Sequence, residues 1–239
     1  TVAVNLTDAT VKGGHHITDN GGTLNWNIDN SSVSARTWTG AGDIEVNNGE
    51  ITVTETLTNN GNFTVAGEST LNIAKLTGNR INLADGSTLT DSNVGGSVNM
   101  KGDLTLVDGD DADANGLTLS GGLWASEGGT LSGDTLSAYY AMFQTGNYTI
   151  SADLELDYGY LSFGGTFTVS STIHTVGTSG EVLYVRGDVD LISGAVLDAD
   201  NGLFLDNDNA VLDVLSGAKI DAESVKLTKS GAKLNVIDG

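Results

Sequence analysis

The chain contains no cysteine and no proline among its 239 residues. Without cysteine, the protein has no disulfide framework and no thiolate chemistry. Proline has no backbone N–H and is therefore rare in strands that are paired on both sides. The absence of proline thus favours a fold in which most backbone N–H groups donate to a neighbouring strand.

Basic residues are scarce: 10 lysines and arginines stand against 31 aspartates and glutamates, for a formal net charge of −21. A nucleic-acid-binding protein needs a basic stripe, and the sequence contains none. Anionic lipid is excluded as a partner for the same reason. An acidic surface of this kind attracts divalent cations.

Long apolar runs are also missing, because no segment approaches the roughly 20 apolar residues of a membrane-spanning helix. The sequence begins at Thr1 and shows no signal-peptide pattern. We expect a mature, processed chain that is secreted to the extracellular space or the cell surface. The alternative is a piece excised from a longer protein.

Glycine is abundant, with 33 residues, and short apolar dyads alternate with polar residues along nearly the whole chain. Examples are Leu24-x-Trp26, Ile51-x-Val53, Leu71-x-Ile73, Leu104-x-Leu106, Leu203-x-Leu205 and Leu234-x-Val236. Gly, Asn, Asp and Ser residues stand in the segments between the dyads. This pattern predicts brief strands with one buried face, separated by tight turns.

The apolar centres recur about every 7–8 residues, and three such strands would make a coil of about 20–25 residues. We therefore predict an all-β fold, a single-stranded parallel β-helix (β-solenoid) of about ten coils, right-handed. It forms one domain over residues 1–239, with residues 1–20 as an N-terminal capping or subunit-contact strand. Pairs such as Asn48-Gly49 and Asn60-Gly61 suit solenoid corners, but they also suit hairpins. An antiparallel β-sandwich or meander is therefore the alternative fold.

Three segments resemble the secreted β-helices of bacterial surface proteins, namely autotransporter passengers and haemagglutinin-like adhesins. They are GNFTVAGESTLNIAKL (Gly61–Leu76), INLADGSTLTDSNVGGSVNMKGDLTL (Ile81–Leu106) and SGAVLDADNGLFLDNDNAVLDVLSGAKI (Ser193–Ile220). Microbial sheath and surface-layer proteins have a similar texture. The resemblance implies a right-handed parallel β-helix with a structural or adhesive role. It carries no family motif and implies no site residue.

The expected function is that of a non-catalytic extracellular structural protein, a subunit that assembles with itself into a surface filament, sheath or layer. One alternative is an adhesin passenger that binds a glycan, a host protein or another cell-surface component. A second alternative is a polysaccharide lyase or depolymerase. Paired carboxylates arise by chance among 31 acidic residues, and the basic residues are scattered, so no catalytic residue is nominated.

Two acidic clusters are candidate calcium sites, the only cofactor that the sequence suggests. The first contains Asp108, Asp111, Asp113 and Asn115, of which the last three stand at alternate positions and match the first half of a calcium loop. The closing glutamate of that loop is replaced by Gly122, so the full motif fails. The second cluster contains Asp198, Asp200, Asp206 and Asp208, whose carboxylates would approach one another if they lie on adjacent coils.

Other residues carry weaker signals. The histidines His15, His16 and His174 show no metal-binding spacing. Trp38, between two threonines, is a candidate surface contact. Four asparagines stand in Asn-x-Ser/Thr glycosylation sequons: Asn5, Asn30, Asn62 and Asn147.

Overall fold

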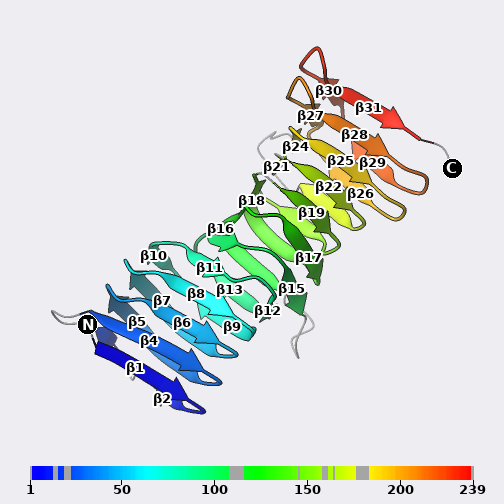
Figure 1. The fold of residues 1–239 in the computed structure, drawn as a ribbon. Helices are drawn as coiled ribbons and strands as arrows, with labels where there is room; N and C mark the ends of the chain where they lie inside the picture. Colours follow the sequence, from blue (N-terminus) through cyan, green and yellow to red (C-terminus); the bar gives the residue numbers. More distant parts are fainter. Residues whose placement is uncertain are drawn as a thin grey trace. The chain divides into compact units, whose positions relative to one another are not determined.

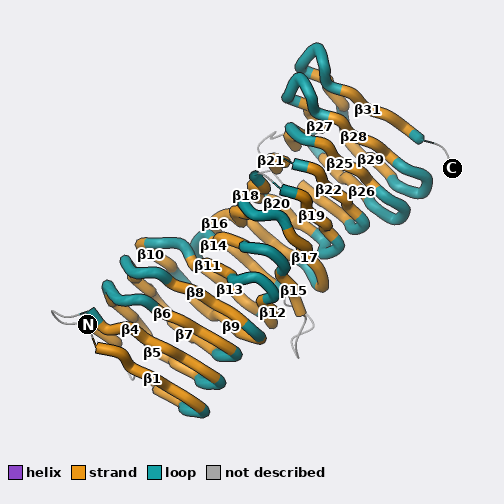
Figure 2. The backbone as a smooth tube through the Cα atoms, in the orientation of Figure 1, coloured by secondary structure: helices purple, strands orange, loops and turns teal. Residues whose placement is uncertain are grey.

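A computed structural model describes residues 2–12, 16–18, 23–107, 116–144, 146–157, 161–163, 165–175 and 183–237. All the regular elements in these ranges are β-strands (Figures 1 and 2). Contacts divide the chain into two compact units, Thr1–Gly121 and Gly122–Gly239. Each unit is a set of parallel strands stacked coil on coil, so each is described separately.

The first unit has three stacks of parallel strands. The first stack contains β1 (Val2–Thr7), β4 (Leu24–Asp29), β6 (Ile44–Asn47), β8 (Phe63–Ala66), β11 (Ile81–Leu83) and β14 (Val98–Met100). The second contains β2 (Thr10–Lys12), the first halves of β5 (Ser32–Gly40) and β7 (Glu50–Asn59), β9 (Glu68–Ile73), β12 (Ser87–Thr90), β13 (Ser92–Val94) and β15 (Leu104–Val107). The third contains β3 (His16–Thr18), the second halves of β5 and β7, and β10 (Leu76–Gly78). β16 (Leu117–Ala125) begins in this unit, where its first residues pair with β13.

The second unit repeats the arrangement. Its first stack contains β17 (Gly129–Gly133), β19 (Asn147–Ile150), β22 (Thr166–Val169), β25 (Asp188–Leu191), β28 (Val211–Val214) and β31 (Lys233–Val236). The second contains the start of β18 (Leu136–Phe143), β20 (Leu154–Leu156), β23 (Thr172–Thr175), β26 (Val196–Ala199) and β29 (Lys219–Ala222). The end of β18 pairs with β21 (Leu161–Phe163), and β24 (Leu183–Val185), β27 (Leu203–Leu205) and β30 (Val225–Leu227) pair in turn.

The predicted fold class is confirmed: the chain is an all-β, parallel β-solenoid of about ten coils. The coil length varies, since the coil that stacks Val98 on Ile81 is shorter than the coil that stacks Val196 on Thr172. The antiparallel sandwich or meander is wrong, because the strand registers in the described ranges are parallel. A single domain, a right-handed coil and a capping strand over residues 1–20 stay predictions.

The core of each unit is a column of apolar side chains that the parallel register places one above another. Ile44, Phe63, Ile81 and Val98 stack in the first unit, and all are buried. Each large apolar side chain that is fully buried contributes about 1.5–3 kcal/mol. The expectation for Trp38 is wrong: its side chain is 1% exposed, because the register places it in an interior column next to Leu57.

One corner of the first unit places a residue with a left-handed backbone in each of four successive coils. Asp8, Asn30 and Asn48 have φ of 50°, 45° and 50°, and Gly67 follows with φ of 64°. Asp and Asn tolerate this conformation better than other residues with a side chain, and Gly adopts it freely. The predicted turn at Asn48-Gly49 is therefore confirmed as a solenoid corner.

Candidate functional site

The outer surface of the second unit carries a ladder of ionisable residues on β20, β23, β26 and β29. The strand register aligns Glu155 with His174, His174 with Asp198, and Asp198 with Asp221. Alternation of the strands buries Ile173 and Leu197 and turns the ladder residues towards solvent. The ladder thus places an imidazole between carboxylates of neighbouring coils.

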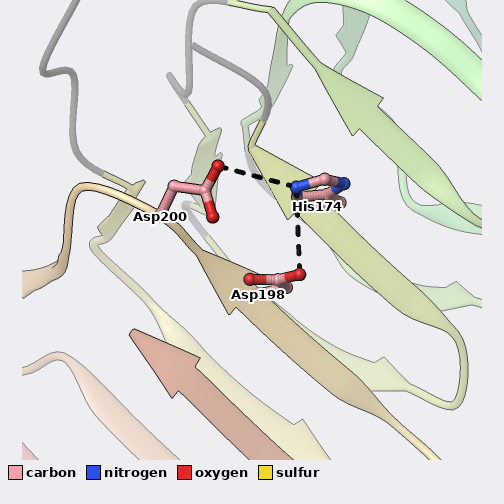
Figure 3. A group of neighbouring side chains, drawn as sticks. All are labelled: His174, Asp198 and Asp200. Carbon is pink, nitrogen blue, oxygen red and sulfur yellow. Dashed lines mark ion pairs between the residues drawn. The ribbon is translucent and has the colours of Figure 1, made fainter. Parts of the chain in front are cut away.

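Asp200, just beyond β26, joins His174 and Asp198 in a compact group (Figure 3). His174 Nε2 lies 3.8 Å from Asp198 Oδ2 and 3.9 Å from Asp200 Oδ2. One ligand atom from each residue lies within 4.8 Å of the others. The side chains of His174 and Asp198 are 36% exposed and that of Asp200 is 60% exposed, so the group is open to ions from solvent.

The structure describes the second of the two acidic clusters predicted from the sequence, and the first lies outside the described residues. Asp108, Asp111, Asp113 and Asn115 lie outside the described residues. Of the second cluster, the structure brings Asp198 and Asp200 together. It places neither Asp206 nor Asp208 in the group of possible metal ligands found in the described ranges.

Asp206 has other partners. The Thr228 hydroxyl donates a hydrogen bond of 2.7 Å to Asp206 Oδ1, and Arg186 approaches Oδ2 at 3.4 Å. The Thr228 hydrogen bond and the nearby charges of Lys229 and Arg186 lower the pKa of Asp206 below its ordinary value. This carboxylate is therefore occupied in joining neighbouring coils.

Sequence reasoning missed His174 as a candidate ligand. The signal was present only in part: Ile173-His174-Thr175 alternates as a strand, which predicts an outward imidazole. Its partner Asp198 lies one coil later, and the sequence separation between the two depends on the length of that coil.

A polar groove follows the left-handed corner of the first unit. Its lining includes Asp8, Asn30, Asn48, Glu50 and Glu68. Carboxylates and amides of this kind can bind water, cations or hydroxylated ligands. The sequon asparagines Asn5, Asn30, Asn62 and Asn147 are all exposed, and their glycosylation stays a prediction.

The last described coil has a different surface, because apolar side chains are exposed on it. Val225, Leu227, Val236 and Ile237 are 38%, 48%, 72% and 46% exposed. Three of them continue buried columns: Val225 aligns with Leu203, Leu227 with Leu205, and Val236 with Val214. This set of four residues is called the terminal apolar face below.

Comparison with protein-family models, with curated proteins and with solved structures finds no match to the chain. The described residues contain no helix of the length and hydropathy needed to cross a bilayer.

Proposed function

We propose that the chain is a non-catalytic, extracellular structural protein that assembles with itself into a surface filament, sheath or layer by stacking solenoid on solenoid. The observation that carries this proposal is the parallel stacking itself, in which the strands of each coil pair with the strands of the next. The terminal apolar face presents interior positions of the same coil pattern to solvent in the described residues. Covering such side chains with a further coil would remove apolar area from water, at about 25 cal/mol per Å².

We infer that a second copy of the chain covers this face. β1 in the first coil pairs in parallel with β4, and the last coil uses the same parallel pairing between β28 and β31. The first coil of one molecule can therefore continue the stack of the last coil of another. Such a head-to-tail contact is heterologous and can repeat without limit, as a filament requires.

The experiment measures assembly of the full chain over a range of concentrations by sedimentation velocity and electron microscopy. We expect fibres or tubes whose mass fraction rises with concentration. The double variant Leu227→Lys/Val236→Lys places charges on the terminal apolar face and should remain monomeric.

The matched control is Val107→Lys, because Val107 is also an exposed large apolar residue but lies in the first unit. It should assemble like the parent chain. Monomers at every concentration, or assembly that the double variant leaves unchanged, would contradict the proposal.

A further inference from the structure

We propose that His174, Asp198 and Asp200 bind a divalent transition-metal ion such as Zn²⁺, which clamps two successive coils of the second unit. His174 comes from β23, whereas both aspartates belong to β26 and the residues after it. The site would therefore join residues of neighbouring coils that are far apart in sequence. This inference is independent of the assembly proposed above.

The distances favour an ion over direct hydrogen bonds. The separations of 3.8 Å and 3.9 Å between His174 Nε2 and the two carboxylate oxygens exceed the range of an N–H···O hydrogen bond. Two ligands that each lie about 2.1 Å from a Zn²⁺ ion are about 3.4 Å apart in a tetrahedral site and about 4.2 Å apart when they lie opposite each other. Both separations lie between these two values, so small side-chain shifts would let the three residues of the group hold a bridging ion (Figure 3).

The ligand types select the metal. Imidazole nitrogen suits Zn²⁺, Co²⁺, Ni²⁺ and Cu²⁺, whereas Ca²⁺ prefers six to eight oxygen ligands. The group offers one nitrogen and two carboxylates, which leaves further positions for water on its exposed side. The geometry therefore points to a transition metal rather than the calcium suggested by the acidic sequence alone.

The surrounding charge also favours a cation. Glu155 and Asp221 flank the group along the ladder, and the whole chain carries a net charge of −21. Lys219, whose charge also interacts with Asp198, is paired with Asp221. A bound dication would offset the repulsion among these carboxylates.

Isothermal titration of the full, tag-free chain with zinc chloride tests the site. We expect His174→Gln, Asp198→Asn and Asp200→Asn each to weaken binding at least about tenfold, since even outer-shell partners of a metal contribute that much. The matched controls are His16→Gln and Asp208→Asn, an exposed histidine and an exposed aspartate outside the group. Equal zinc affinity in the parent and in the three ligand variants would overturn the site.

Competition tests the choice of metal. Zinc should stay bound in about a 100-fold excess of Ca²⁺ or Mg²⁺, because the imidazole ligand disfavours both. Displacement of zinc by Ca²⁺ at comparable concentration would overturn the assignment. With Co²⁺ as the probe, the parent should show visible absorption that changes in the His174→Gln variant, and an unchanged spectrum would place the ion elsewhere.

The clamp is tested by stability. Zinc that binds the folded chain alone should raise the unfolding temperature as the ratio of zinc to its dissociation constant increases. The His174→Gln variant, checked for folding by circular dichroism, should show no such rise, whereas His16→Gln should behave as the parent. An equal rise in parent and His174→Gln would contradict the clamp.

Discussion

Buried serines satisfy backbone N–H groups in three coils of the first unit. Ser31 accepts a hydrogen bond from the N–H of Ala9, and Ser92 accepts one from the N–H of Leu71. Ser69 does the same for Gly49. Each serine hydroxyl then donates to a backbone carbonyl two or three residues earlier. The hydroxyl of each serine thus accepts a hydrogen bond from the preceding coil and donates one within its own corner.

We expect Ser92→Ala to lower the free energy of unfolding by about 1–3 kcal/mol, because the buried N–H of Leu71 loses its acceptor. Urea denaturation of the full chain measures the change. Ser216→Ala is the matched control, since Ser216 is exposed in a turn, and it should leave stability within about 0.5 kcal/mol of the parent. Equal effects of the two substitutions would contradict this role for Ser92.

Asp190 faces a like charge across the stack. It aligns with Asp213 of the next coil, and burial, the Asp213 charge and the Asp188 charge raise the pKa of Asp190 above its ordinary value. A carboxyl whose folded-state pKa is raised binds its proton more tightly in the folded chain than in the unfolded chain. Its contribution to stability therefore falls as the pH rises from the ordinary carboxyl pKa through the raised one.

Asp190→Asn removes this penalty and should stabilise the chain at pH 7 by up to about 1 kcal/mol, the range of a cross-strand pair. The gain should disappear below about pH 3.5, where the parent carboxyl is protonated in both states. Urea denaturation at several pH values measures it, with Asp208→Asn as the control. A gain that persists unchanged at low pH would contradict the electrostatic cause.

At the scale of the element, the backbone of the corner restricts the types of residue that can connect two strands. A Cβ added to Gly67 would lie 2.3 Å from Asn48 Oδ1, and that oxygen accepts a hydrogen bond from the N–H of Glu68. The asparagine side chain cannot move away without losing this bond. Gly86 also has a positive φ, but an added Cβ there meets open space.

Substitution of these two glycines by alanine distinguishes the energetic cost of backbone strain from that of steric overlap. Gly86→Ala should cost about 1–2 kcal/mol through its left-handed backbone alone. Gly67→Ala should cost at least about 1 kcal/mol more, because it adds an overlap with Asn48. In the Asn48→Gly background most of the extra cost should disappear, with the 3.0 Å approach to Asn47 Oδ1 remaining, as measured by a double-mutant cycle in urea. Equal costs at the two glycines in the parent chain would exclude the overlap.

Much of each strand could be predicted from local alternation, whereas the pairing of coils could not. Leu71 and Ile73 are buried as their dyad indicates, and Asn48 makes the expected corner. The partner of His174 depends on coil length, and the coil from Glu155 to His174 is shorter than the coil from His174 to Asp198. Turns of variable length leave no periodic signal. The sequence alone therefore does not show which residues of neighbouring coils meet on the outer surface.

Trp38 shows the same limit inside the core. Its polar neighbours suggest a surface position, but the register of β3, β5 and β7 aligns it with Ile17 and Leu57. The side chain that lies above or below a residue decides its burial, and that neighbour is about one coil away in sequence. The threonines next to a bulky residue in the sequence are therefore a poor guide to whether its side chain is buried.

At the scale of the whole molecule, stability in a solenoid is the sum of coils and of the interfaces between neighbours. An interior coil has two such interfaces. The last described coil, with β29, β30 and β31, pairs with the preceding coil through β26, β27 and β28. Its terminal apolar face gains little from burial, so this coil should open more readily than those before it.

Hydrogen exchange followed by mass spectrometry tests this gradient. In dilute solution, amides of residues 219–237 should exchange faster than those of residues 188–214. If copies stack head to tail, a second molecule supplies the missing interface, and protection of residues 219–237 should rise with protein concentration. The Leu227→Lys/Val236→Lys variant should keep the gradient and lose its concentration dependence. Protection of the last coil equal to that of interior coils at the lowest concentration would mean that the exposed apolar residues do not weaken it, and the physical reason for stacking would be lost.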